Sequence, residues 1–113
     1  MLKKSKYGNK KVEHKGLKFD SKKEFFRYLA HEDDLKQGKI KGFSFQVPFK
    51  YYMNDKWIFT YIADFVVEQL DGTKIVEDVK GIDKKTKKPI TTALFNLKKK
   101  IIEQEYKIKI EIV

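Results

Sequence analysis

The sequence predicts one α/β (α+β) domain, in which a mixed β-sheet is flanked by helices. Two segments carry apolar residues at helical spacing, and four others alternate apolar and polar residues as half-buried strands do. The chain has 113 residues, of which 41% are hydrophobic, enough for one compact domain with one core. No linker or repeat divides it.

The N-terminal segment is strongly basic. Residues 1–23 hold nine lysines against Glu13 and Asp20, which accounts for +7 of the formal net charge of +10. Residues 1–10 contain little that a core could bury, so we expect a basic flexible arm there and a single domain over residues 11–113. The stretch "KVEHKGLKFD" predicts a short hairpin with its turn at Lys15-Gly16.

A first helix is expected to begin at Ser21. Ser21 at the N-cap and Glu24 three residues later form a capping box, "SKKE". Gly38 ends the helix. The apolar residues between them recur at helical spacing: Phe25, Tyr28, Leu29 and Leu35.

Three strands should follow, over residues 41–52, 57–70 and 74–81. In the first, Pro48 indicates an edge strand, a bulge or the end of pairing. The turn between the second and third lies at Asp71-Gly72. The apolar side chains of the first strand alternate along one face: Phe43, Phe45, Val47 and Phe49.

The chain is expected to end in a helix and a strand. The helix should cover residues 92–106, with Leu94, Leu97 and Ile101 on one face. Residues 107–113 alternate as a strand. Because a strand-helix-strand connection forms a right-handed crossover, we expect this strand to lie parallel to one of the others.

Charged residues interrupt the two strands that should be most buried. Asp64 lies within one apolar run, and Asp78 and Lys80 end the next. Asp78 and Lys80 share a face because side chains alternate along a strand. A loop with an odd number of residues between the strands would place Asp64 on that same face, whereas a two-residue turn would place it opposite Val79.

Two carboxylates and a lysine at this spacing are typical of phosphodiester chemistry. Oxygen ligands with open water positions suit Mg²⁺ or Mn²⁺, which can activate a bound water and polarise a phosphate. A nearby lysine can orient that water and offset charge in the transition state. The alternative is a set of cross-strand ion pairs at a solvated sheet edge.

These residues resemble the PD-(D/E)xK nuclease superfamily. "ADF" supplies the first acid, and "DVK" at 78–80 supplies the second acid and the lysine. Together with "SKKE" and "EDVKG", they are similar to small phage and prophage proteins of that superfamily and, more distantly, to Holliday junction resolvases and the endonuclease subunit of some transposases. Two positions depart from the pattern: Ala63 replaces the proline of the superfamily name, and Asp78 replaces the commoner glutamate.

The resemblance implies a restriction-endonuclease-like core, ordered helix-strand-strand-strand-helix-strand, and a Mg²⁺-dependent endodeoxyribonuclease. The substrate could be branched DNA such as a Holliday junction. Asp64 and Asp78 would hold the metal, Lys80 would assist the water, and Glu24 matches the helix acid that often completes such sites.

Two more polar residues are weaker candidates for the same site. Gln46 lies in the first strand, where such families place a residue near the active site, and it is otherwise a solvent-facing side chain. Glu77 would replace Asp78 as the second acid if the strand register slipped. Glu24 also has a purely local alternative role, in the capping box.

The partner expected from the charge is nucleic acid, because a net charge of +10 suits a polyanion. A basic loop directly after "DVKG" should hold the DNA backbone through Lys84, Lys85, Lys87 and Lys88. Tyr51, Tyr52 and Trp57 could stack on bases, but we favour core or edge packing for them. We expect His31 on the surface of the first helix or partly buried.

Other functions remain open at this point. The protein could bind DNA without cutting it, or it could use the same fold to bind a host protein. A junction-resolving enzyme needs two sites and so would be a homodimer. The absence of cysteine and of a long apolar run fits a cytoplasmic protein, in the host cell if phage-encoded, without membrane contact.

Overall fold

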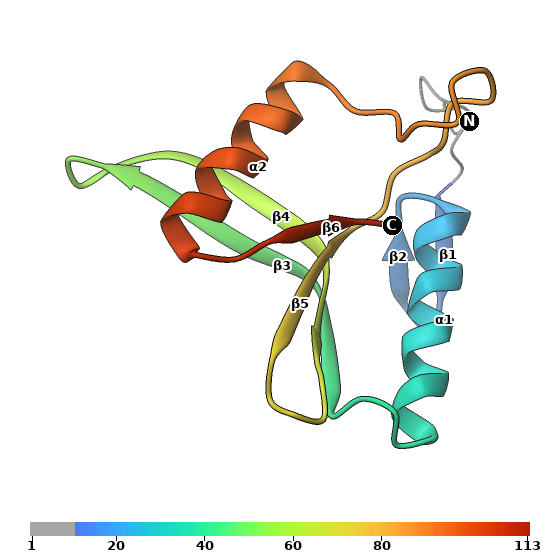
Figure 1. Ribbon diagram of the computed structural model, residues 1–113. Helices are drawn as coiled ribbons and strands as arrows, with labels where there is room; N and C mark the ends of the chain where they lie inside the picture. The colour runs from blue at the N-terminus through green and yellow to red at the C-terminus, as the bar shows by residue number, and fades with distance from the viewer. Residues whose placement is uncertain (1–10) are drawn as a thin grey trace.

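The computed structural model describes residues 11–113, so the expected arm at residues 1–10 lies outside the described part of the chain. In that part, two helices flank a mixed four-stranded sheet, and a two-stranded hairpin precedes them (Figure 1). The predicted α+β class and the predicted order of elements are confirmed. No helix within residues 11–113 combines the length and the apolar character needed to cross a membrane.

The N-terminal hairpin consists of β1 (Val12–His14) and β2 (Leu17–Phe19), paired antiparallel. Its turn is at Lys15-Gly16, as expected, and both residues have positive φ. Phe19 is buried, and its ring centroid lies 5.1 Å from that of Tyr28. This contact packs the hairpin against α1.

Helix α1 (Lys22–Lys36) begins at the predicted cap. Ser21 Oγ accepts a hydrogen bond from the Glu24 backbone N–H at 3.1 Å. Glu24 Oε2 in turn accepts one from the backbone N–H of Asp20, one residue before the N-cap. Of the predicted apolar face, Leu35 is exposed. The expectation for His31 was wrong, since it is the buried residue of this helix.

The sheet has the order β3-β4-β5-β6, in which β6 alone runs parallel to its neighbour. Its strands are β3 (Gly42–Met53), β4 (Lys56–Glu68), β5 (Lys74–Asp78) and β6 (Ile110–Ile112). β3 is an edge strand, which agrees with Pro48. β6 pairs in parallel with β5 across α2, as the crossover argument predicts.

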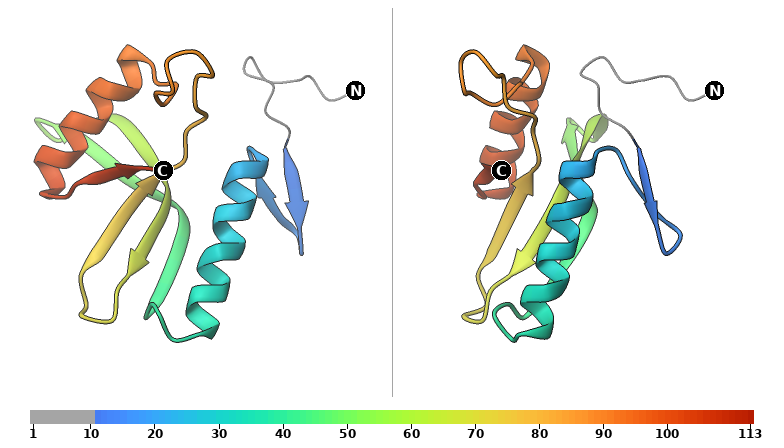
Figure 2. Two further views of the ribbon diagram at one scale, coloured as in Figure 1. Left: turned by 45° about the vertical axis from the view of Figure 1, so that its right-hand side comes forward. Right: turned by 90° about the vertical axis from the view of Figure 1, so that its right-hand side faces the viewer.

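The long β3-β4 hairpin is bent (Figures 1 and 2). Its ladder of paired residues is interrupted between Phe45–Phe65 and Val47–Ala63, where Gln46 and Asp64 lie. Gln46 has φ +54°, a left-handed conformation that is rare inside a strand. On one side of the bend, Tyr61 and Ala63 pack in a cluster with Ile102 of α2. On the other side, Phe65 packs in a cluster with Tyr28 of α1. Because of the bend, β4 packs against both helices.

Helix α2 (Ala93–Tyr106) starts after the N-cap Thr92, whose Oγ1 accepts a hydrogen bond from Phe95 N–H. The predicted stripe of Leu94, Leu97 and Ile101 is not the one that packs on the sheet. Phe95 and Ile102 face the sheet, whereas Leu94 and Leu97 are 60% and 56% exposed. Both stripes follow helical spacing, and the larger Phe95 ring fills the space above Tyr61.

Candidate active site

The site lies where β4 and β5 separate. Their antiparallel ladder ends at the pair Phe65–Glu77, and one step further Asp64 lies opposite Asp78. There the Val79 N–H donates at 2.7 Å to the side chain of Asp64, Oδ2, in place of a strand carbonyl. The loop between the two strands, residues 69–73, has an odd length, and both acids face one pocket.

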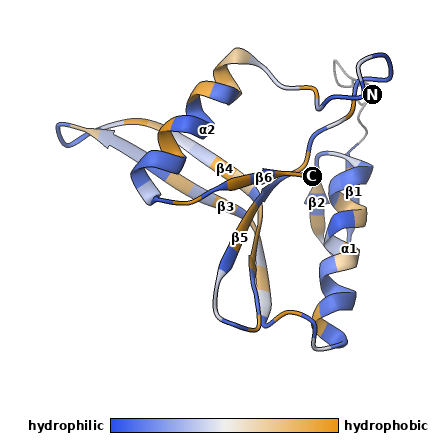
Figure 3. Ribbon diagram, viewed as in Figure 1, coloured by the Kyte–Doolittle hydropathy of each residue, from blue (hydrophilic) through white to orange (hydrophobic). Residues whose placement is uncertain are grey.

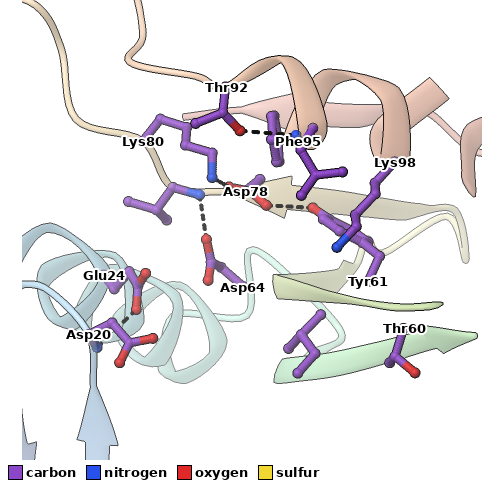
Figure 4. Close-up of a pocket in the computed structure, with 13 residues that line it drawn as sticks. Asp20, Glu24, Thr60, Tyr61, Asp64, Asp78, Lys80, Thr92, Phe95 and Lys98 are labelled. Atoms are coloured by element: carbon purple, nitrogen blue, oxygen red, sulfur yellow. Dashed lines mark hydrogen bonds and ion pairs between the residues drawn. The ribbon is translucent and has the colours of Figure 1, made fainter.

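The pocket has a volume of about 460 Å³. Figure 4 shows the side chains of Asp64, Asp78, Lys80 and Glu24 turned toward one another from β4, β5 and α1. The remaining lining residues come from β4, from α2, from the segments before the two helices and from the position after β5: Asp20, Thr60, Tyr61, Ile62, Val79, Thr92, Leu94, Phe95 and Lys98. The structure thus brings together the four residues that the sequence pattern selected for catalysis.

Asp78 is held from both sides. It is 4% exposed, and its Oδ2 accepts a hydrogen bond of 2.5 Å from the hydroxyl of Tyr61. Its Oδ1 accepts no hydrogen bond from residues 11–113, although Lys80 Nζ lies 3.0 Å away as an ion pair. A buried carboxylate oxygen with spare lone pairs is available to a further cation or donor.

Lys80 is positioned by three contacts. Besides its ion pair with Asp78, its Nζ lies 3.9 Å from the ring centroid of Phe95, in cation–π geometry. Its own carbonyl accepts a hydrogen bond from Lys23 Nζ of α1. The ammonium therefore sits between a carboxylate and an aromatic face, at the junction of both helices with the sheet.

The carboxylates destabilise one another. Burial, reinforced by the charges of Glu24 and Asp78, raises the pKa of Asp64 to about 8. Burial also raises the pKa of Glu24, and the neighbouring acids Asp20 and Asp78 add to that shift. Such a group of acids is stabilised when a cation joins it or when one member keeps a proton.

The donor set fits a hydrated, oxygen-preferring divalent cation better than a caged one. Within residues 11–113, no three His, Cys, Asp or Glu side chains stand at metal-binding distances of one point. Mg²⁺ commonly takes one or two carboxylates and completes its shell with waters and substrate phosphates. Asp64 and Asp78 could supply those carboxylates, with Asp78 Oδ1 already free of hydrogen bonds from the described chain.

Glu77 points to the opposite side of the sheet from the pocket. It is 4% exposed and accepts hydrogen bonds from Arg27 Nε at 3.0 Å and from Arg27 Nη2 at 2.5 Å. The Nε2 atom of His31 lies 2.7 Å away. Burial acts to raise the pKa of Glu77, but the bonds from His31 and Arg27 outweigh it and lower the pKa to about 2. Glu77 joins α1 to β5 rather than entering the pocket.

Gln46 also lies outside the pocket lining. Its side chain is exposed, and Nε2 donates at 3.0 Å to the carbonyl of Lys18 in β2. Although Gln46 lies at the same interruption of the ladder as Asp64, its left-handed backbone directs it to the N-terminal hairpin. The structure thus gives Gln46 a contact with the N-terminal hairpin and no place in the pocket.

The four lysines of the basic loop are exposed and lie between two pocket residues, Lys80 and Thr92. The loop has its own internal structure, because Asp83 Oδ1 accepts hydrogen bonds from the backbone of Lys85 and Thr86. Ile82 and Pro89 form an isolated β-bridge at its base. Figure 3 shows this loop as a hydrophilic projection above the hydrophobic junction of β5 and β6.

Three contributors to the site escaped the sequence analysis: Tyr61, Phe95 and Asp20. Tyr61 and Phe95 look like ordinary core residues in a strand and a helix, and no spacing rule pairs either with Asp78 or Lys80. Asp20 could have been found, since it directly precedes the capping box that holds Glu24.

A family model described as "Protein of unknown function (DUF1064)" matches residues 4–112, which include every residue of the pocket. The chain belongs to this family. Comparisons with curated proteins and with solved structures gave no match. The DUF1064 description assigns no activity, so the case for a function rests on the pocket.

Proposed function

We propose that this DUF1064 protein is a metal-dependent DNA endonuclease. The observation that carries the proposal is the imbalance of charge in the pocket. Among the described residues four acids line it, Asp20, Glu24, Asp64 and Asp78, against two lysines. Asp78 is almost fully buried, which argues against the alternative of ion pairs at a solvated sheet edge.

The arrangement of elements supports the resemblance to PD-(D/E)xK nucleases. The order α1, β3, β4, β5, α2, β6 matches the restriction-endonuclease-like core that the resemblance implies. The acids and the lysine lie where the two central strands diverge. Because side chains alternate along β5, Asp78 and Glu77 point to opposite faces of the sheet. In this proposal Asp78, not Glu77, is the second acid.

Each residue of the pocket would have its own role in cleavage. Asp64 and Asp78, with Glu24 beside them, would hold Mg²⁺ or Mn²⁺, which when bound polarises a phosphate oxygen and lowers the pKa of a coordinated water. Lys80 orients the attacking water and offsets the negative charge that develops on the phosphoryl oxygens. Tyr61 fixes the carboxylate of Asp78, and Phe95 fixes the ammonium of Lys80.

DNA is the substrate that the surrounding charge favours. Lys98 lines the pocket, and the four lysines of residues 84–88 follow shortly after Asp78, the last residue of β5, and Lys80. Ammonium groups at these places would contact the phosphates on either side of the scissile one.

A cleavage panel tests the proposal. Duplex, single-stranded, flap and four-way junction DNA are incubated with Mg²⁺, with Mn²⁺ or with EDTA, using wild type and Lys80→Met. The methionine keeps an unbranched side chain of similar length beside Phe95 and removes the charge. We expect metal-dependent cleavage of at least one substrate and a loss of about 10²-fold or more in Lys80→Met, while Lys109→Met, on an exposed residue away from the pocket, cuts like wild type.

The outcomes separate the functions that the sequence left open. DNA binding without cleavage under either metal would contradict the proposal and indicate a non-catalytic DNA-binding protein. If the protein neither binds nor cleaves any of these substrates, that result would favour a protein that binds a host protein.

A further inference from the structure

Within residues 11–113, no element covers one face of the far half of the β3-β4 hairpin. β5 pairs only with Phe65–Glu68 of β4, and the hairpin continues well beyond that ladder (Figure 1). Phe49 and Tyr61 pack toward α2 on one side. On the other side, three apolar or aromatic residues are each more than half exposed: Tyr52, Trp57 and Ile62.

The two aromatic rings of this face form a cross-strand pair. Tyr52 and Trp57 are register partners at the step where the ladder shifts. The indole Nε1 of Trp57 donates at 3.0 Å to Thr60 Oγ1, which holds the ring along the strand. Thr60 and Ile62 themselves line the candidate active site, so the exposed face runs without interruption into the pocket.

The charge around this face favours a polyanion over an apolar partner. Lys50 and Lys56 flank the aromatic pair against the single acid Asp55, and Lys98 lines the pocket into which this face leads. Exposed aromatic rings beside lysines are the arrangement by which proteins bind unpaired nucleotides, through base stacking and phosphate contacts. In a duplex the base faces are already stacked and unavailable to such rings.

We propose that the outer face of the β3-β4 hairpin binds single-stranded DNA, with bases stacked on Trp57 and Tyr52 and the strand leading toward the pocket. The binding of single-stranded DNA to this face does not depend on the proposed function, whereas delivery of a phosphodiester to the pocket for cleavage rests on it. Trp57 and Asp64 are seven strand positions apart, about 23 Å. That length corresponds to about seven nucleotides at the spacing of stacked bases, so the substrate class is DNA with an unpaired segment of that order beside the cut.

Trp57 is the one tryptophan of the chain, so its fluorescence reports on this face alone. An oligothymidylate of about 20 nucleotides, longer than typical single-strand site sizes, is titrated in EDTA, where no cleavage occurs, and compared with a blunt duplex of equal length. We expect saturable quenching by the oligothymidylate and weaker quenching by the duplex.

Matched variants test the same claim by anisotropy of a labelled oligonucleotide. Trp57→Leu should weaken oligothymidylate binding about 5- to 150-fold, the range for loss of one base stack, and leave duplex binding unchanged. Leu97→Ala, which alters an exposed apolar residue on α2, should change neither.

Unquenched tryptophan together with unchanged affinity in Trp57→Leu would overturn the inference. Equal quenching by both DNAs would also overturn it, as would a fluorescence change with protein concentration alone, which would assign the face to a second copy of the chain. Quenching in a protein that never cleaves DNA would support the inference while refuting the nuclease proposal.

Discussion

The hydroxyl of Tyr61 donates a hydrogen bond to Oδ2 of Asp78 across the gap between β4 and β5, at 2.5 Å. The bond occupies one carboxylate oxygen and leaves Oδ1 directed at Lys80. We predict that Tyr61→Phe raises the Mg²⁺ concentration needed for half-maximal cleavage about 10- to 150-fold, since a hydrogen bond to a charged group is worth about 1.5–3 kcal/mol.

Tyr106→Phe is the matched control for this change. It also removes one tyrosine hydroxyl, which donates to the carbonyl of Lys50 away from the pocket. Equal Mg²⁺ requirements in wild type and both variants would show that Tyr61 does not position Asp78.

Asp64 should make the metal-free protein less stable as the pH rises. Its pKa is about 8 in the folded protein against an ordinary value of 3.8, so the folded state holds the proton more tightly than the unfolded state. The free energy of unfolding then falls between about pH 4 and pH 8, by at most about 1.4 kcal/mol per pH unit. Asp64→Asn should remove most of that slope.

Urea denaturation in EDTA at several pH values between 4 and 8 measures this slope. Asp55→Asn, at the exposed hairpin turn, should retain the wild-type slope. Added Mg²⁺ should restore the stability of wild type at pH 8 and leave Asp64→Asn nearly unchanged. A wild-type slope as flat as that of Asp64→Asn would contradict the raised pKa of the buried Asp64 carboxyl.

Glu77 should have the opposite effect on stability. Its pKa of about 2 lies below the ordinary value of 4.5, so its contribution is present above pH 4.5 and is lost as the pH falls toward 2. Glu77→Gln leaves Arg27 and His31 without their buried partner, and we predict a loss of about 3 kcal/mol in unfolding free energy at pH 7.

Urea denaturation by circular dichroism measures that loss, with Glu111→Gln on an exposed residue as the control. The difference between Glu77→Gln and wild type should shrink as the pH is lowered from 4.5. A variant as stable as wild type at pH 7 would mean that this ion-pair group contributes nothing to the fold.

The capping and alternation rules predicted most of the fold because they depend on neighbours in the sequence. Ser21 caps the first helix as predicted, and the odd loop length places Asp64 beside Asp78. The same local character explains what was missed. Helical spacing cannot choose between the Leu94–Leu97 stripe and the Phe95–Ile102 stripe, since only the shape of the bent sheet decides which of them it accepts.

The remaining misses concern pairs of residues far apart in the chain. His31 looks like a surface residue until Glu77, 46 positions later, is placed against it. Tyr61 looks like core until the end of the β4-β5 ladder opens a space for Asp78. The left-handed backbone of Gln46 carries no signal in the sequence, because glutamine has no preference for that conformation.

The loop lysines should contribute to DNA binding through phosphate contacts. Changing Lys84, Lys85, Lys87 and Lys88 to alanine should lower the slope of log K against log salt by up to about 0.9 per lost contact on duplex DNA. Changing Lys36 and Lys39, exposed residues at the far end of α1, should leave the slope unchanged. If both sets give the wild-type slope, the loop does not touch the backbone.

The rate of Mg²⁺-dependent DNA cleavage by Asp78→Asn, measured beside wild type and Glu105→Gln at equal occupancy of DNA, tests the central claim most directly. The amide keeps the shape and the bond from Tyr61 but loses the charge that would hold the cation, whereas Glu105 is an exposed acid of α2 that does not line this pocket. We predict that Asp78→Asn folds and binds DNA like wild type but gives no detectable cleavage, while Glu105→Gln cuts at the wild-type rate. Cleavage by Asp78→Asn at the wild-type rate would contradict the assignment of the pocket as the catalytic site.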